Sequence, residues 1–141
     1  MNALFTRPIL IVLMLLMAAA CAKKSETDAD YEWPEMESFH MVMAEAFHPY
    51  KDSSNVESVK RLAEEMALEA DRWQSSPLPS KVNTDEVKDQ LEKLKVGTRA
   101  LADQIKTGAS DEEIGATLTI LHDAFHKITE AWHGGGEKHE K

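Results

Sequence analysis

Apolar residues recur every three to four positions along four stretches of the chain, which is the spacing of amphipathic α-helices. The stretches span residues 34–51, 54–74, 84–106 and 110–133, and polar links separate them. No stretch alternates apolar and polar residues with the period of a β-strand. Because short links make successive helices antiparallel neighbours, the pattern predicts an all-α, up-down-up-down antiparallel four-helix bundle over residues 31–133.

Short capping motifs predict where the helices begin and end. Ser54 with Glu57, and Ser110 with Glu113, have the Ser-x-x-Glu spacing of a capping box, in which each side chain pairs with the other residue's backbone N–H. We therefore expect the second and fourth helices to begin at these serines. Gly108 can adopt the positive φ that often follows a helix, so the third helix is expected to end just before it.

One side of each stretch gathers the side chains that are expected to form the core. In the third stretch these residues are alternately four and three apart, which is a heptad seam interrupted only by Thr98. In the first stretch the same side includes His40. The predicted inner faces are Met36, Phe39, His40, Met43, Phe47 and Tyr50; Val56, Val59, Ala63, Met66, Ala70 and Trp73; Val87, Leu91, Leu94, Thr98, Leu101 and Ile105; and Ile114, Leu118, Leu121, Phe125, Ile128 and Trp132.

The N-terminus has a different pattern from the rest of the chain. Arg7 precedes an uninterrupted apolar run over residues 9–20, which is shorter than the roughly 20 residues of a transmembrane helix. A basic start, an apolar run and small residues before a cleavage point are typical of a secretory signal peptide. The only cysteine, Cys21, follows three alanines, and this arrangement resembles the lipobox of bacterial lipoproteins.

The lipobox resemblance implies that Cys21 is acylated and anchors the protein to a membrane. Ala22 follows the cysteine where an aspartate would retain a lipoprotein at the inner membrane, so the resemblance implies an outer-membrane anchor facing the periplasm. An ordinary signal peptide with an incidental cysteine is the alternative. The predicted organisation is a signal peptide over 1–20, the lipidated cysteine and a polar tether over 21–30, the bundle over 31–133 and a polar tail over 134–141.

The charge of the chain limits its partners. The formal net charge is −9, and removal of the signal peptide takes away Arg7 but no acid, so the mature chain is more acidic. An acidic domain repels nucleic acid, whereas cations, including metal ions, remain compatible partners. The sequence contains no nucleophile–base pair, phosphate loop or catalytic acid pair that we recognise, so we do not expect an enzyme.

The histidines are concentrated in the first and fourth predicted helices. His122 and His126 have the i, i+4 spacing that lets two imidazoles reach one metal ion. In an antiparallel pair of helices, His40 is expected at the same height as His122. The three side chains therefore predict a site for a transition metal, and we expect copper or zinc. Candidates for the fourth ligand are Met36, Glu37 and Met43.

The histidines also allow interpretations other than a shared metal site. His48 and His133 lie near predicted helix C-termini, where the helix dipole favours a protonated imidazole, and we interpret them as boundary residues. His139 lies in the polar tail. The three central histidines could likewise be unrelated residues at the edge of the core. Glu37 and His40 have the spacing of di-iron bundles, but the inner faces of the second and third helices lack the carboxylates of such a site.

Residues 115–128 resemble the haem helix of the cytochrome c-prime family. His122 stands at the haem-ligating position, Phe125 at an aromatic position and His126 at a basic one. Leu118 and Leu121 occupy the positions of the two cysteines. The resemblance therefore implies the four-helix fold without covalent haem attachment.

A non-covalent haem is the alternative that this resemblance implies. The b-type four-helix cytochromes use a methionine of the first helix and a histidine of the last, and Met36 with His126 or His122 could form such a pair. We expect a lipid-anchored bundle that binds copper or zinc. The alternatives are a b-type haem protein in electron transfer and a cofactor-free interaction module, and a homodimer is left open.

Overall fold

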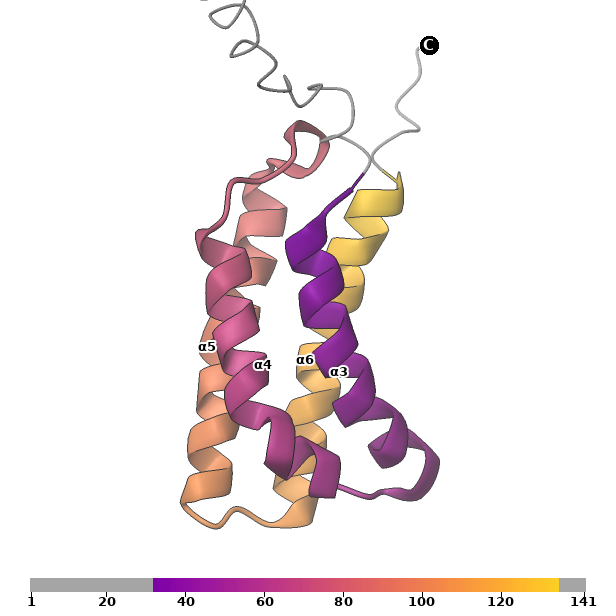
Figure 1. The fold of residues 1–141 in the computed structure, drawn as a ribbon, viewed down its shortest axis with the longest axis vertical. Coiled ribbons are helices and arrows are strands. Elements are labelled where there is room, and N and C mark those ends of the chain that lie inside the picture. Colours follow the sequence, from indigo (N-terminus) through magenta and orange to yellow (C-terminus); the bar gives the residue numbers. More distant parts are fainter. Residues whose placement is uncertain (1–31, 135–141) are drawn as a thin grey trace, which may run out of the picture.

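The computed structural model of the protein describes residues 32–134 as four α-helices and one short 3-10 helix. The helices are α3 (Pro34–Ser53), α4 (Glu57–Ser75), α5 (Asp85–Lys106) and α6 (Asp111–Gly134), and η1 (Ser80–Val82) lies between α4 and α5. Figure 1 shows the four helices side by side along one long axis, with successive helices joined at alternate ends of the bundle. The predicted all-α four-helix bundle is confirmed.

The predicted N-terminal and C-terminal segments lie outside the described residues. The signal peptide, Cys21, the tether and the end of the polar tail fall there and stay predictions. Within residues 32–134, no helix has both the length and the apolar character that a membrane crossing requires.

The start of α6 and the end of α5 are as predicted. The Glu113 carboxylate accepts a hydrogen bond from the Ser110 backbone N–H at 2.8 Å, and the Glu113 N–H donates to the Ser110 hydroxyl at 3.3 Å. This reciprocal pairing is the capping box, and it satisfies two N–H groups that the first turn of a helix leaves free. Gly108 has a φ of 83° in the turn that follows α5.

The predicted capping box at the start of the second helix is wrong. Ser54 has a φ of 57° and a left-handed conformation, and it terminates α3. Its backbone N–H donates to the carbonyl of Tyr50 at 2.7 Å, which closes the last turn of α3. Asn55 takes the role expected of Ser54, because its side-chain oxygen accepts the Glu57 N–H at 2.9 Å. An N-cap residue typically has a β-region backbone, whereas Ser54 is left-handed, so its side chain does not take the capping position.

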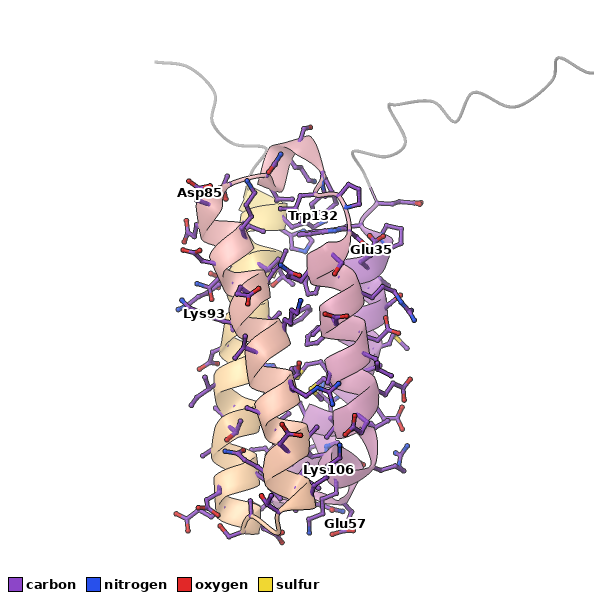
Figure 2. The ribbon with its side chains drawn as sticks, turned by 90° about the vertical axis from the view of Figure 1, so that its left-hand side faces the viewer. Glu35, Glu57, Asp85, Lys93, Lys106 and Trp132 are labelled. Carbon is purple, nitrogen blue, oxygen red and sulfur yellow. The ribbon has the colours of Figure 1, made fainter. Side chains whose placement is uncertain are left out.

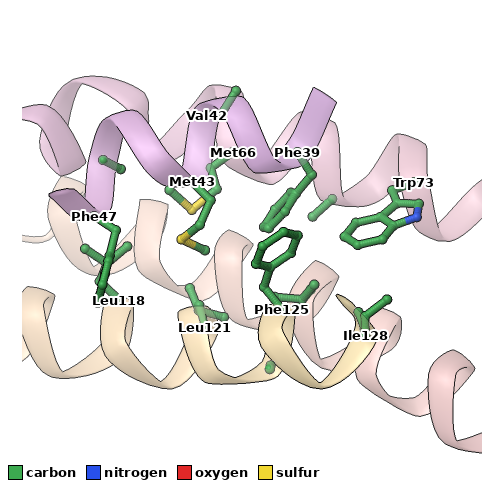
Figure 3. Close-up of a cluster of buried hydrophobic side chains, with 14 of the residues drawn as sticks. Phe39, Val42, Met43, Phe47, Met66, Trp73, Leu118, Leu121, Phe125 and Ile128 are labelled. Atoms are coloured by element: carbon green, nitrogen blue, oxygen red, sulfur yellow. The ribbon is translucent and has the colours of Figure 1, made fainter. Parts of the chain in front are cut away.

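The core is a continuous layer of apolar side chains between the helices (Figure 3). Rings dominate the half nearer the start of α3: Phe39 lies 5.5 Å from Trp73 and 5.7 Å from Phe125, measured between ring centroids. Trp33 in turn contacts Trp73 and Trp132 at 5.1 and 5.4 Å. Aromatic contacts at these separations stabilise a core beyond the area that they bury.

Nearly all predicted inner faces are buried. The six positions assigned to each of the second and fourth helices are buried, and the heptad seam of the third is buried except for the partly exposed Ile105. The first helix differs, because the His40 side chain is 50% exposed. Val42 and Ala46 are buried instead, so the inner face of α3 is rotated slightly away from the predicted one. The expectation that His40 lies inside the apolar face is therefore wrong.

Charged side chains cover the outside of the bundle. Figure 2 shows them projecting from the outer faces of the helices, with Lys93 and Lys106 among them. Between α4 and α5, Glu64 accepts a hydrogen bond from Arg99 at 2.8 Å and also pairs with Lys106. These hydrogen bonds lower the pKa of the Glu64 carboxyl. Exposed pairs of this kind contribute little stability, and the core carries most of it.

A glycine lets α3 and α6 approach each other at the end of the bundle where α3 ends and α6 begins. Gly115 is buried, and a Cβ placed on it would overlap the ring of Tyr50. We expect Gly115→Ala to lower the free energy of unfolding by about 1–3 kcal/mol, the usual range for overpacking, even though alanine favours a helix. Denaturant unfolding of Gly115→Ala alone and combined with Tyr50→Ala tests this. An equal loss of stability in both backgrounds would contradict the proposed overlap.

Candidate metal site

The seam between α3 and α6 differs from the other seams of the bundle. The two backbones come close at fewer positions than those of helices that follow each other in the chain. Side-chain rings fill the space between them: Phe39 on Phe125, and Phe47 on His122. Figure 3 shows these phenylalanines of α3 pointing toward α6. The histidines of both helices flank this ring-filled seam.

Two grooves follow the seam and meet at its middle. The first, which we call the tryptophan groove, has a volume of about 660 Å³, and the second, the histidine groove, one of about 240 Å³. They share His40, Phe125 and His126. The tryptophan groove is lined by Glu32, Trp33, Pro34, Met36, Glu37, His40, Phe125, His126, Thr129, Trp132 and His133. The histidine groove is lined by His40, Met43, Ala44, Phe47, His48, Lys51, His122, Phe125 and His126.

His122 and His126 form a close pair on α6. Their Nε2 atoms are 3.1 Å apart, which is a hydrogen-bond distance between two neutral imidazoles when one ring has its proton on Nε2 and the other has its proton on Nδ1. Two nitrogens that share one ion at about 2.0–2.1 Å are separated by about 3.3 Å at a tetrahedral angle and about 2.9 Å at a right angle. The observed separation lies between these values. The distance between the two nitrogens is therefore compatible with two ligands of one ion.

The surroundings of His122 fix its orientation. Its ring stacks face to face on Phe47, with centroids 3.7 Å apart and an interplanar angle of 9°. Its Nδ1 lies 3.8 Å from a carboxylate oxygen of Asp123, on the side away from His126. Burial lowers the pKa of His122, and the nearby His126 lowers it further. His122 is thus a neutral imidazole at neutral pH, which is the form that binds metal ions.

His40 reaches the same groove from α3. Its ring stacks over Phe125, with centroids 5.3 Å apart and an interplanar angle of 18°. Its Nδ1 lies 3.9 Å from a carboxylate oxygen of Glu37, one turn earlier in α3. Because half of its side chain is exposed, His40 can rotate without disturbing the core. His40, His122 and His126 line one groove, and the α6 pair is in direct contact. The prediction that His40 lies at the height of His122 is wrong, because His40 stacks on Phe125 whereas His122 stacks on Phe47, two turns further along α3.

The other predicted ligands are divided between the two grooves. Met43 lines the histidine groove from the core side and is 1% exposed. Met36 and Glu37 line the tryptophan groove, and Met36 is partly buried. Among the described residues, no three His, Cys, Asp or Glu side chains form a group that could hold a metal ion. The two-histidine pair is the part of the predicted site that the structure brings together.

Three neighbours of the histidines were not predicted from the sequence. Phe47 was assigned to the core, yet its ring also faces His122. Asp123 follows its histidine directly, and Lys51 lies one turn beyond Phe47 on the same helix. The spacing of Phe47 and Lys51 could have indicated a shared helix face, but no local pattern indicates which α6 residue that face meets.

The lowered pKa of His122 predicts acid sensitivity. In the unfolded chain this histidine titrates near its ordinary pKa of 6.5, and in the folded chain it titrates lower. As the pH falls through 6.5, the unfolded state takes up the proton first, so the free energy of unfolding decreases toward pH 5. We expect His122→Gln to reduce this dependence in chelator-treated protein, measured by urea unfolding between pH 7 and pH 5. An unchanged slope in His122→Gln, equal to that of the exposed control His133→Gln, would contradict the prediction.

Comparisons of the chain with family models, with curated proteins and with solved structures found no match. The likeness of residues 115–128 to the cytochrome c-prime haem helix therefore remains a prediction. The function of the chain is inferred below from the residues of the α3–α6 seam.

Proposed function

We propose that this protein binds one transition metal ion, copper or zinc, through the Nε2 atoms of His122 and His126. The observation that carries the proposal is the 3.1 Å separation of these two atoms, which suits ligands of a single ion. His40 is the third ligand, because it lines the same groove and has the freedom to turn toward the pair. In the absence of metal, a proton between the two imidazoles takes the place of the ion.

Carboxylates near the outer ring nitrogens support this assignment. Metal-binding histidines usually present one ring nitrogen to the ion and the other to a carboxylate, carbonyl or water, which fixes the ring and raises its basicity. Asp123 lies 3.8 Å from Nδ1 of His122, and Glu37 lies 3.9 Å from Nδ1 of His40. Both distances exceed a hydrogen bond, and a small rotation of either ring would bring its Nδ1–H within reach of the carboxylate. Nε2 is therefore the nitrogen left for the metal in both rings.

The chemistry of the ligands favours copper or zinc among the common ions. Imidazole suits Cu, Zn, Ni and Fe, whereas Mg and Ca require oxygen ligands. A thioether would add preference for Cu(I), and Met43 is the methionine that lines the histidine groove. Met36 and Glu37 line the adjoining tryptophan groove and do not line the histidine groove.

The packing of the seam favours a bare ion over a haem. A haem between α3 and α6 needs the space that Phe39 and Phe125 occupy, and both rings are buried. Leu118 and Leu121, at the positions of the haem-attaching cysteines in the resemblance, are buried core residues as well. The described residues therefore do not fit a haem held inside the bundle.

We further propose that the bundle works at the periplasmic face of the outer membrane, anchored through a lipid on Cys21. This proposal rests on the lipobox-like sequence at residues 18–21. A tethered, acidic domain with one metal site could carry, buffer or sense an ion at the membrane surface. A cofactor-free interaction module, as a monomer or a homodimer, is the alternative if no ion binds.

Equilibrium dialysis of the full chain in detergent against Zn²⁺ and Cu²⁺ tests the metal site. We expect one ion per chain for the unchanged protein, at least a tenfold loss of affinity in His126→Ala, and a smaller loss in His40→Ala. His133→Ala is the matched control, because this exposed histidine of α6 lines only the tryptophan groove. Equal binding by His126→Ala and His133→Ala would overturn the proposal.

A further inference from the structure

The lining of the histidine groove carries a positive charge, although the protein as a whole is acidic. The residues that line it include Lys51 and four histidines but no carboxylate. The carboxylates nearest to the proposed ligands, Asp123 and Glu37, lie beside Nδ1 atoms, whereas His122 faces His126 through Nε2. A divalent ion at the His122–His126 pair would thus be coordinated by neutral ligands only. Its full positive charge would remain inside the groove.

Two imidazoles also leave coordination positions open. Zinc takes four ligands and Cu²⁺ four or more in tetragonal geometry. Even with His40 as a third ligand, one position faces the groove. Open positions are typical of metal sites that bind an exogenous ligand, whereas closed four-ligand sites are structural.

Lys51 provides a positive charge in the lining of the histidine groove. It lies in the last turn of α3, lines the histidine groove, and is exposed. Its charge acts on His122, whose pKa it lowers slightly. Within residues 32–134, no carboxylate forms an ion pair with Lys51. His48, one turn earlier, also lines the groove and offers a ring N–H as a hydrogen-bond donor.

We propose that the site binds its metal ion together with a small monovalent anion, which occupies the open coordination position and lies between the ion and Lys51. This inference rests on the proposed metal site. The anion would neutralise part of the charge that the imidazoles leave on the ion, while Lys51 attracts it from the other side. The groove volume of about 240 Å³ is several times the roughly 30 Å³ that a water occupies, so a triatomic anion fits beside the metal.

Azide is the probe for this site. Azide bound to Cu²⁺ gives a charge-transfer absorption that free azide lacks, so its binding can be followed directly. The full chain in detergent, loaded with one equivalent of Cu²⁺, is titrated with azide at constant ionic strength. We expect saturable growth of this absorption at one azide per copper, and tighter copper binding in the presence of azide.

Substitution of Lys51 separates a local contact from the general charge of the protein. We expect Lys51→Gln to weaken azide binding about two- to fivefold, the effect of one partly exposed charge pair, while copper affinity without azide stays unchanged or rises. Lys127→Gln changes the net charge equally, but Lys127 lies on α6 outside the residues that line the histidine groove. This control is expected to leave azide affinity within experimental error.

The outcomes distinguish failure of this inference from failure of the metal site. Copper binding without a saturable azide signal overturns the anion proposal and leaves the proposed function standing. Equal azide affinities in Lys51→Gln and Lys127→Gln overturn the role of Lys51. No stoichiometric copper binding overturns the proposed function and this inference together.

Discussion

Replacement of Trp73 with alanine is expected to lower the free energy of unfolding by about 3–5 kcal/mol, the range for large aromatic truncations in well-packed cores. Trp73 is completely buried and its ring contacts Trp33, Phe39 and Phe125. Trp73 lies on α4, whereas Phe39 lies on α3 and Phe125 on α6, and Trp33 directly precedes α3. The cavity left by the missing indole would therefore weaken the packing of α4 against both α3 and α6. Because a domain is stable by about 5–15 kcal/mol in total, urea unfolding should show a large decrease in midpoint.

Two further variants check that the loss comes from packing. Trp73 Nε1 is buried and has no hydrogen-bond partner among the described residues, so Trp73→Phe removes an unpaired donor and is expected to cost less than Trp73→Ala. Leu68 lies on the same helix and is 59% exposed. We expect Leu68→Ala to change stability by about 0.5 kcal/mol or less. Similar losses in Trp73→Ala and Leu68→Ala would contradict the described core.

The second large effect expected is stabilisation of the bundle by its metal ion. A ligand that binds only the folded state stabilises it by about 2.7 kcal/mol at a free concentration of 100 times its dissociation constant. For a domain of about 100 residues this raises the melting temperature by roughly 10 °C or more. Unfolding separates α3 from α6 and breaks the local geometry of the His122–His126 pair, so the unfolded chain lacks the site.

Thermal melting followed by circular dichroism measures this effect with Zn²⁺ and with a chelator. The increase in melting temperature is expected to vanish in His122→Gln/His126→Gln and to persist in His133→Gln. It is also expected to decrease below pH 6, because protons then compete with the metal for the imidazoles. A shift of the same size in the double variant would point to non-specific binding at the acidic surface.

The fold could be predicted from local sequence patterns because burial in a helical bundle repeats with the helical period. The six inner positions of α6 that were predicted from spacing, from Ile114 to Trp132, are all buried. The Ser110–Glu113 capping box was equally local, since both partners lie within one turn. Features of this kind depend on residues three or four apart, which the sequence contains directly.

The errors arose where two elements compete for one residue or meet in space. Ser54 has the spacing of a helix start, but the end of α3 uses it first, in a left-handed conformation. His40 lies at the margin of an inner face, and the rotation of α3 against α6 decides whether that margin is buried. The stacking of Phe47 on His122 joins residues far apart in the chain. Helix periodicity places each residue on a face but does not set the rotation of one helix against another.

The central claim is that His122 and His126 share one metal ion through Nε2. Titration of Zn²⁺ into protein labelled with ¹⁵N in its histidine rings, followed by NMR, tests this claim most directly. The account predicts that the Nε2 resonances of both residues shift together and saturate at one equivalent, and that both Nδ1 atoms are protonated in the metal-bound form. Unchanged resonances at both residues, or saturation at His48 and His133 instead, would contradict it.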